Sequence, residues 1–314
     1  MSLPFFSADD VMSAVSMQEA IDAMEIAFSS VANKTAQVPL RIDMPIVDRH
    51  AHHLSMPAYI TGGKYITIKL INVHSKNPSI GNDLINGVIV VMDAETGNAT
   101  AIIDGKSVTS LRTGAASGYA TKILSNKNSS NAVVFGNGVQ AKTQIEAIRT
   151  VRNLQSIKVL GRNSEKINLF CSQFDDKVSL GSVSDLKNAD IICTATRSKE
   201  PLFKFNNISN GAHVNAVGAH GLHKREVPTK LIQNSKVFVD SLASSQKEAG
   251  NLLIPINKGD YSWNEVQGEI GELNNPSSHG RVNESDITFF NSVGTAVQDL
   301  VISNIVMEKN TGAI

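Results

Sequence analysis

The chain has 314 residues, with 29 basic and 29 acidic side chains and a formal net charge of +0. A neutral chain gives no electrostatic reason to bind nucleic acid or an anionic membrane surface. No apolar run approaches the roughly 20 residues of a membrane span, and no secretory signal is visible. Two cysteines at no metal-like spacing fit a reducing compartment, and we expect a cytoplasmic protein. The length favours two domains, each able to hold its own core.

The first third of the sequence predicts helices followed by a sheet. Ser7 caps a short helix, and Ser16-Met17-Gln18-Glu19 has the capping-box pattern that begins a second one. Alternating or β-branched segments then predict strands at 38–42, 51–59, 65–73, 88–93 and 100–104. Residues 95–98 are typical of a hairpin turn. This part carries no glycine fingerprint, so we expect it to bind substrate or to mediate assembly.

Residues 107–124 predict a helix that can pack closely on another backbone. Small residues dominate its middle, from Gly114 to Gly118. Arg112 lies near its start, where a cation is locally unfavourable for the helix. We infer that Arg112 serves something other than helix stability.

Residues 131–141 carry a possible dinucleotide fingerprint, and they read N-A-V-V-F-G-N-G-V-Q-A. An apolar strand precedes Gly136-x-Gly138-x-x-Ala141, and Ile145 and Ile148 continue it at helical spacing. Gly136 permits a tight turn, and Gly138 lets the backbone approach a pyrophosphate. The helix N-terminus then offers unpaired N–H groups and a partial positive charge. An ordinary strand–turn–helix corner is the alternative.

The next strand, 156–160, indicates which cofactor is preferred. NAD sites usually end this strand with Asp or Glu, which binds the ribose 2′-hydroxyl. Here Gly161 and Arg162 follow the strand, and an arginine can bind a 2′-phosphate. The pattern favours NADPH, with NADH possible. A solvated surface arginine is the alternative.

Further strands at 189–196, 213–218, 236–240 and 287–290 predict a parallel, doubly wound sheet. Ligands bind at the carboxyl ends of such strands, where Thr194, Thr196 and Val217 lie. A last helix follows Gly294, and we expect it to return to the N-terminal domain. Cys171 and Cys193 have no metal-like spacing, and each falls in an apolar setting that suits a small core residue.

Several motifs together resemble one family. They are, in chain order, V-P-L-R, M-P-A-Y, T-I-K-L, D-G-K-S-V-T-S-L-R-T-G-A-A, G-N-G-V-Q-A, G-A-H-V-N-A-V-G-A and N-S-V-G-T-A-V-Q-D. The chain is similar to the ornithine cyclodeaminase/μ-crystallin family over nearly its whole length. The resemblance implies an α/β fold, in which a Rossmann-type doubly wound sheet is inserted into a second, α+β domain.

The inserted domain, 113–292, would bind the dinucleotide, whereas 1–112 and 293–314 would bind substrate and form a homodimer. The resemblance and the strand ends together give a set of cofactor-binding residues. It comprises Thr113, Gly136, Gly138, Val139, Gln140, Arg162, Asn163, Thr194, Thr196, Val217 and Ser292.

In that family an arginine, a lysine and a second arginine hold the substrate carboxylate, and the matching positions are Arg41, Lys69 and Arg112. Guanidinium groups suit this role because they bind a carboxylate through two parallel hydrogen bonds. Lys69 lies in an apolar strand beside other cations, both of which lower a lysine pKa. We therefore expect Lys69 to be the catalytic proton donor. A structural ion pair is the alternative for any one of the three.

Two features depart from the cyclodeaminases. His220 stands where they carry a catalytic aspartate, and His52-His53 precede Met56 without a carboxylate for a second amino group of ornithine. Arg162 and the Arg225-Glu226 pair look more like the μ-crystallin branch, whose members reduce cyclic ketimines with NADPH. We expect His220 to line the substrate pocket.

The histidines predict no metal site. His50, His52 and His53 are close in sequence, and His220 and His223 are three positions apart. No nearby cysteine or carboxylate completes a ligand set, and hydride chemistry needs no metal.

The resulting hypothesis is NAD(P)H-dependent reduction of a cyclic ketimine acid, with conversion of Δ1-pyrroline-2-carboxylate to L-proline preferred. The cofactor supplies the hydride, and the protein supplies position and charge. Alanine dehydrogenase activity is the next alternative, because its iminium intermediate is chemically similar, and ornithine cyclodeamination comes third. A μ-crystallin-like protein that binds a small ligand is the non-enzymatic alternative.

Overall fold

The computed structural model describes residues 3–275 and 277–311. The chain forms two compact units. Unit 1 consists of Met1–Arg112 together with Thr295–Ile314, and unit 2 is Thr113–Gly294. Unit 2 is therefore inserted into the chain of unit 1, and α3 (Gly105–Leu124) spans the first boundary.

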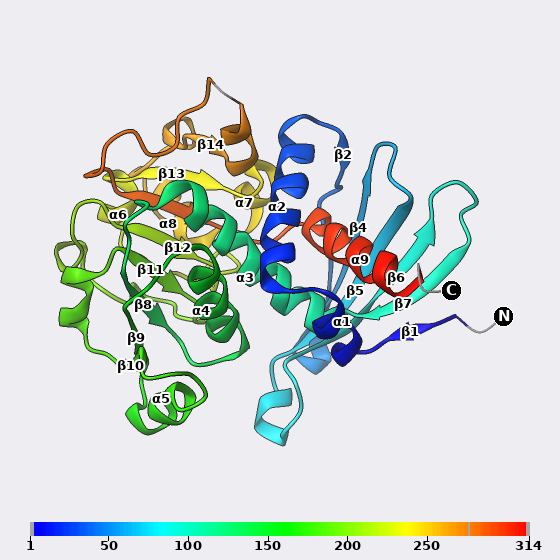
Figure 1. Ribbon diagram of the computed structural model, residues 1–314, viewed down its shortest axis with the longest axis horizontal. Coiled ribbons are helices and arrows are strands. Elements are labelled where there is room, and N and C mark those ends of the chain that lie inside the picture. The colour runs from blue at the N-terminus through cyan, green and yellow to red at the C-terminus, as the bar shows by residue number, and fades with distance from the viewer. Residues whose placement is uncertain (1–2, 276, 312–314) are drawn as a thin grey trace. The chain divides into compact units, whose positions relative to one another are not determined.

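Unit 1 is a mixed sheet with helices packed against it. Its other elements are β1 (Phe5–Phe6), α1 (Ala8–Ala14), α2 (Met17–Ala32), β2 (Ala36–Gln37), β3 (Ile42–Ile46), β4 (Ala51–Ile60), β5 (Tyr65–His74), β6 (Ile85–Asp93), β7 (Ala99–Asp104) and α9 (Ala296–Thr311). The strand order is β1-β7-β6-β5-β4-β2, and β3 also pairs with β4. Figure 1 shows α9, in red, lying across the strands, where it packs on β4 and β5.

The first two helices begin as the sequence predicts. The Ser7 hydroxyl accepts from the Asp10 N–H, and the Asp10 carboxylate accepts from the Ser7 N–H at 2.7 Å. Ser16 and Glu19 form the same reciprocal pair at the start of α2. Each box satisfies N–H groups that a helix start leaves without partners.

The predicted strand 38–42 is wrong, because the chain leaves the sheet there. β2 ends at Gln37, which pairs with Tyr59, and β3 begins at Ile42, which pairs with Ser55. The chain thus advances five residues between these two pairs while β4 advances four, so regular pairing is interrupted. Pro39 lies in this interruption, and proline has no N–H to donate to a strand ladder. Arg41 is consequently carried by an irregular segment.

The two faces of this sheet differ in burial. Along β5 the alternate residues Tyr65, Thr67, Lys69 and Ile71 are buried on the helix-covered face. The residues between them face outward and are half-buried. Near the middle of β5, β6 and β7 the outward side chains are apolar, and Ile68, Val90 and Ile102 form a continuous cross-strand row. Unit 1 thus presents an apolar row on its outer sheet face.

Unit 2 is a parallel sheet between helices. Its elements are β8 (Asn131–Phe135), α4 (Val139–Val151), β9 (Ser156–Leu160), α5 (Ser164–Cys171), β10 (Val178–Leu180), β11 (Ile191–Thr194), β12 (His213–Ala216), α6 (Thr229–Gln233), β13 (Lys236–Val239), α7 (Leu242–Glu248), α8 (Gly250–Asn257), β14 (Gly268–Glu269) and β15 (Thr288–Asn291). The strand order is β10-β9-β8-β11-β12-β15-β13-β14. This confirms the predicted doubly wound sheet, whose order reverses between β8 and β11.

Both faces of the unit 2 sheet are buried, so its strands are apolar at consecutive positions. On β8, Val133 and Phe135 belong to one core cluster and Ala132 and Val134 to the other. The small residues of α3 explain its close packing on α4: a Cβ at Gly114 would lie 2.6 Å from the backbone oxygen of Thr143.

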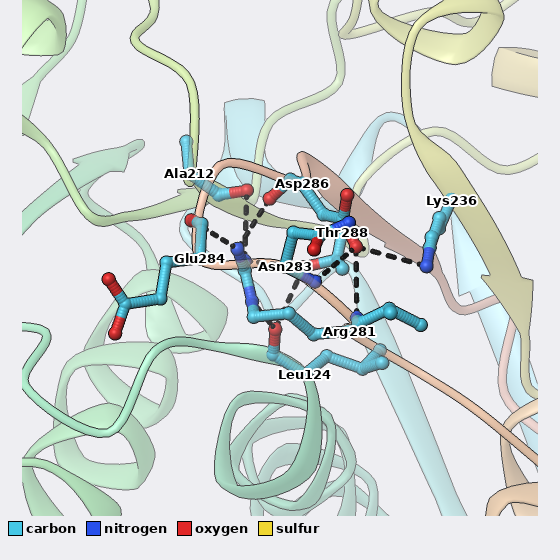
Figure 2. A network of polar contacts seen from close by, with 9 residues as sticks. Leu124, Ala212, Lys236, Arg281, Asn283, Glu284, Asp286 and Thr288 are labelled. Carbon is cyan, nitrogen blue, oxygen red and sulfur yellow. Dashed lines mark hydrogen bonds and ion pairs between the residues drawn. The ribbon is translucent and has the colours of Figure 1, made fainter.

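An arginine stabilises the amino-terminal edge of this sheet (Figure 2). The Arg281 Nε donates to the Leu124 oxygen at 2.8 Å, and its terminal nitrogens donate to the oxygens of Ala212 and Glu284 and to the Thr288 hydroxyl. One guanidinium therefore joins the end of α3 to the starts of β12 and β15. Guanidinium presents five donors in a fixed plane, which suits several converging carbonyls.

Short 3₁₀ helices complete the described chain. They are η1 (Val47–Arg49), η2 (Asn77–Ile80), η3 (Val183–Asn188), η4 (Phe205–Asn207), η5 (Trp263–Glu265) and η6 (Ile270–Asn274). Within residues 3–275 and 277–311, no helix has the length and apolar character needed to cross a membrane.

Candidate functional site

A buried ion pair lies at the centre of unit 1. The Lys69 Nζ is 2.6 Å from the Asp299 Oδ2, and both side chains are 1% exposed. β5 carries the lysine on its helix-covered face, and α9 carries the aspartate. Burying both charges costs several kcal/mol per ion before their attraction offsets it. Such a pair is a poor way to stabilise a fold, so it indicates a functional role.

Two arginines complete the cluster. The Arg112 Nε is 3.4 Å from the Asp299 Oδ1, and its Nη1 donates to the Gln298 Oε1 at 2.9 Å. Arg41 is half-buried and close enough to influence the charge of Lys69. The structure therefore brings together the three cations predicted from the sequence and adds Asp299 and Gln298 from α9.

The surroundings lower the pKa of Lys69 to about 7. Burial is the largest cause, and the positive charges of Arg112 and Arg41 act in the same direction. The charge and hydrogen bond of Asp299 oppose the shift. An amine with this pKa exchanges a proton readily at neutral pH, which suits a general acid or base.

The cluster can bind a carboxylate and deliver a proton. Lys69 and Arg112 both lie within 4 Å of the buried Asp299 carboxylate, and the charge of Arg41 also acts on Lys69, so the local charge has room for an additional anion. Arg112 is held in place through Gln298 and Asp299, which leaves the orientation of its planar group fixed. A fixed guanidinium loses little entropy when it binds a carboxylate.

The glycine turn of unit 2 has the shape that a phosphate needs. Gly136 has φ +116°, and a Cβ there would lie 2.7 Å from the Ala195 oxygen, so only glycine fits. Gly138 is the N-cap of α4, and a Cβ there would meet nothing within 4 Å. Val139 and Gln140 form the first turn of this helix, whose N–H groups have no intrahelical partners. These residues fit a dinucleotide pyrophosphate.

The end of β9 carries no carboxylate. Gly161 follows the strand, Arg162 is exposed, and Asn163 caps α5 by accepting from the Lys166 N–H at 2.9 Å. A Cβ at Gly161 would lie 2.7 Å from the Ile167 Cδ1. A cofactor ribose at this strand end would meet a cation and no anion.

The predicted cofactor residues at the later strand ends are bound to buried carboxylates. The hydroxyls of Thr194 and Thr196 donate to Glu226, at 3.0 Å and 2.7 Å. The Ser292 hydroxyl donates to the Asp240 Oδ2 at 2.7 Å. These hydroxyl protons are engaged, so a ligand at this edge would meet the backbone of the segments or a hydroxyl lone pair.

The remaining predicted residues are Thr113, Val217 and His220. Thr113 is buried, and its oxygen accepts from the Gln144 side chain at 3.3 Å. Val217 is buried just after β12. His220 is exposed in unit 2, whereas Arg41, Lys69 and Arg112 belong to unit 1. Among the described residues, no group of three or more His, Cys, Asp or Glu side chains is arranged to hold a metal ion.

Sequence reasoning did not select Asp299, Gln298, Glu226 or Asp240 as site residues. Each of these side chains is at most 1% exposed. A polar side chain is seldom buried so deeply without a partner, which marks all four in the structure. One signal was present for the first two: Gln298 and Asp299 end the N-S-V-G-T-A-V-Q-D motif. Glu226 stands in the Arg225-Glu226 pair, which indicated a branch of the family and not a buried carboxylate.

Comparison with known proteins places the chain among enzymes. The model of the family described as "Ornithine cyclodeaminase/mu-crystallin family" matches residues 4–313. A Delta(1)-pyrroline-2-carboxylate reductase of Bacillus cereus is 31% identical over 310 residues, which cover 96% of this chain and 95% of that protein.

Two solved structures share the fold over nearly the whole chain. The Delta(1)-pyrroline-2-carboxylate reductase of Thermococcus litoralis, in complex with NADH and L-proline, has a TM-score of 0.94 and 31% identity, covering 99% of this chain and 98% of that one. An archaeal alanine dehydrogenase dimer with bound NAD has a TM-score of 0.94 and 31% identity, covering 100% and 97%.

Proposed function

The chain belongs to the ornithine cyclodeaminase/mu-crystallin family, and on that premise we propose that it reduces Δ1-pyrroline-2-carboxylate to L-proline with a nicotinamide cofactor. The observation that carries the proposal is the buried cluster of Arg112, Lys69 and Asp299. It offers one carboxylate-binding group and one proton donor, which is what a ketimine acid requires. The similar reductase that binds NADH and L-proline supports the same reaction.

In this mechanism the substrate carboxylate binds to Arg112 and Arg41. Binding there fixes the imine carbon and nitrogen relative to Lys69. Lys69 gives a proton to the imine nitrogen, and its pKa of about 7 makes that transfer feasible at neutral pH. Asp299 keeps the Nζ in place and stabilises the ammonium until the transfer occurs. The bound cofactor supplies the hydride that reduces the imine carbon.

The cofactor would bind unit 2, with its pyrophosphate at the start of α4. NADPH is the form that we propose, because Arg162 and Gly161 replace the carboxylate that usually holds a 2′-hydroxyl. The two similar structures contain NADH and NAD, so a direct comparison of the two reduced cofactors is the test.

Alanine dehydrogenase activity is the second candidate, because an alanine dehydrogenase is as similar in structure and identity. The same cluster could hold the carboxylate of an iminium formed from pyruvate and ammonia. Ornithine cyclodeamination has weaker support, since His220 replaces the family's catalytic aspartate.

We also propose a homodimer formed through the outer sheet face of unit 1. Ile68, Val90 and Ile102 form an apolar row there, and Ile42 and Met44 on β3 are 64% and 52% exposed. Contiguous apolar surface on a folded chain marks an interaction site. The dimeric state of the similar alanine dehydrogenase supports a second copy of this chain as the occupant.

The deciding experiment is oxidation of NADPH and NADH by the purified protein. The substrates are pyrroline-2-carboxylate, piperideine-2-carboxylate, and pyruvate with ammonia, and ornithine is tested separately for ammonia release. We expect pyrroline-2-carboxylate to give the highest kcat/KM. Faster turnover of pyruvate with ammonia would favour the dehydrogenase. Cofactor binding without turnover of any substrate would favour a ligand-binding protein.

A further inference from the structure

A second buried carboxylate lies at the carboxyl edge of the unit 2 sheet. Glu226 is 0% exposed. Its Oε1 accepts from the Thr196 N–H at 2.6 Å and from the Thr196 hydroxyl at 2.7 Å. Its Oε2 accepts from the Thr194 hydroxyl at 3.0 Å and from the Gly218 N–H at 2.9 Å. Both oxygens are therefore acceptors, as expected of an ionised carboxylate.

The backbone of Glu226 is held as firmly as its side chain. The Asn251 Oδ1 accepts from the N–H of Glu226 at 2.8 Å and from that of Val227 at 3.3 Å. These two donors fix the orientation of the Asn251 amide, whose Nδ2 then donates to the Asn291 Oδ1 at 3.0 Å. The network thus extends from the ends of β11 and β12, through α8, to the end of β15.

Glu226 sets the spacing of two segments that run side by side. A Cβ at Gly218 would lie 2.0 Å from the Thr196 oxygen and 2.7 Å from the Glu226 Oε1. The segments after β11 and β12 are therefore in backbone contact, and the carboxylate bridges them through one N–H of each. A shift of Glu226 would change both segments together.

These segments follow β11 and β12, the first two strands of the second half of the sheet. In this strand order the pyrophosphate binds at the first strand, β8, and the adenosine ribose binds at the next one, β9. The second half of the sheet, beginning with β11 and β12, is left for the nicotinamide half. Burial raises the pKa of Glu226, and the four hydrogen bonds that it accepts oppose that shift.

We propose that Glu226 is a positioning residue for the nicotinamide half of the cofactor: its buried carboxylate fixes the segments after β11 and β12 at the spacing that this half requires. The inference rests on the proposed use of a nicotinamide cofactor. A positioning role for the Glu226 carboxylate has a consequence that a purely structural role would not have. The oxidised nicotinamide ring is positively charged and the reduced ring is neutral, so a buried anion close to the segments that would hold the ring should favour the oxidised form.

The test compares Glu226→Gln with Thr288→Val. The first substitution keeps the size of the side chain and removes its charge. The second removes a buried hydroxyl at the opposite edge of the sheet, where Thr288 contacts His213 and the Leu124 oxygen. Thermal unfolding gives the stability of each variant. The whole protein is titrated with the oxidised or the reduced cofactor while its fluorescence is recorded. Each titration gives the Kd for that form of the cofactor.

We expect Glu226→Gln to weaken both forms and to weaken the oxidised form several-fold more. Thr288→Val should lower the melting temperature and leave the ratio of the two Kd values unchanged. An unchanged ratio with wild-type affinities in Glu226→Gln would overturn the inference, whatever its stability. If the wild-type protein bound neither form, the proposed function itself would fail.

A second variant covers the case in which Glu226→Gln does not fold. Asn251→Ala leaves the Glu226 charge in place and removes the acceptor for its backbone N–H. We expect this variant to bind both cofactor forms several-fold more weakly without changing their ratio. Wild-type affinity for both forms in a folded Asn251→Ala protein would contradict the positioning role.

Discussion

Lys69 and Asp299 are 230 positions apart in sequence, yet the lysine Nζ donates to the aspartate Oδ2 at 2.6 Å in the interior of unit 1. The pair links strand β5 to helix α9. Since the lysine pKa is lowered to about 7 by burial and by neighbouring arginines, Asp299 is what keeps a useful fraction of this amine protonated.

Asp299→Asn should move the pH dependence of catalysis. Removing the carboxylate charge lowers the pKa of Lys69 further below about 7, because the remaining causes all favour the neutral amine. A proton donor is active when protonated, so kcat/KM should fall as pH rises through the lysine pKa. The alkaline limb of the pH profile should therefore move to lower pH. The exposed Asp9→Asn is the control, and an unmoved limb would contradict the assignment of Lys69.

Lys69→Met should reduce kcat strongly, by the ~100-fold to 10,000-fold typical of a lost general acid. Arg112→Met should mainly raise KM, because a carboxylate is gripped in both the ground and the transition state. Lys64→Met is the control, because Lys64 is exposed and lies directly before β5, the strand that carries Lys69. Steady-state kinetics with pyrroline-2-carboxylate separates the two effects. Near-wild-type kcat in Lys69→Met, with loss of activity in His220→Ala, would assign proton donation to His220.

Arg162→Ala should weaken NADPH more than NADH. A charge-assisted contact to the 2′-phosphate is worth about 1.5–3 kcal/mol, which is roughly tenfold to a hundredfold in Kd. Lys166→Ala, which removes an exposed cation four positions further along the chain on α5, is the matched control. Titration with each reduced cofactor measures the difference. An equal loss for both would sink the proposed 2′-phosphate contact.

Ile68→Glu should convert the proposed dimer into a monomer. It places a charge in the middle of the apolar outer row of unit 1, where a partner would have to desolvate it. Leu169→Glu, at a side chain that is 71% exposed on α5, serves as the control. Sedimentation at several concentrations reports the mass. A dilute, fully active monomeric wild-type protein would contradict the dimer directly.

His213 should make unit 2 sensitive to acid. Burial, and then the charge of Arg281, lower its pKa from 6.5 to about 3. Between these values the unfolded chain binds the proton and the folded chain does not, so stability falls as pH decreases through this window. The slope is about 1.4 kcal/mol per pH unit for one such group. His213→Asn should flatten it, whereas the exposed His279→Asn should not; denaturant melts at several pH values measure both slopes.

The regular elements of this fold can be predicted from the sequence because the patterns that indicate them are local. Capping at Ser7 and Ser16 and the alternation along β5 each depend on a few neighbouring residues. The turn at Gly136 is readable for the same reason, since its φ of +116° requires glycine. By contrast, β1 is only two residues long and runs parallel to β7, so it is too short for a periodic pattern to predict it.

The site residues also divide into those that a local sequence pattern indicates and those that only the folded structure reveals. Arg41, Lys69 and Arg112 could be proposed from motifs, although their alternative as structural ion pairs remained open from the residues alone. Asp299 and Glu226 could not be identified as buried carboxylates, because burial is decided by partners far along the chain. The Asp299 pair closes over 230 positions, and the contact from Thr194 to Glu226 closes over 32. Sites assembled over such separations depend on tertiary packing rather than on a local pattern.

The return of the chain to unit 1 has a consequence for biosynthesis. Domains generally fold as they emerge from the ribosome, N-terminal parts first. Residues 113–294 can thus complete their sheet while β4 and β5 still lack α9, which follows unit 2 in the chain. Until α9 arrives, Lys69 has no anionic partner from that helix, and Arg112 has neither Gln298 nor Asp299 to hold it. A chain that stopped before α9 would therefore contain a completed unit 2 sheet and an unassembled charge cluster, so the proposed proton donor would gain its carboxylate partner only when α9 has been made.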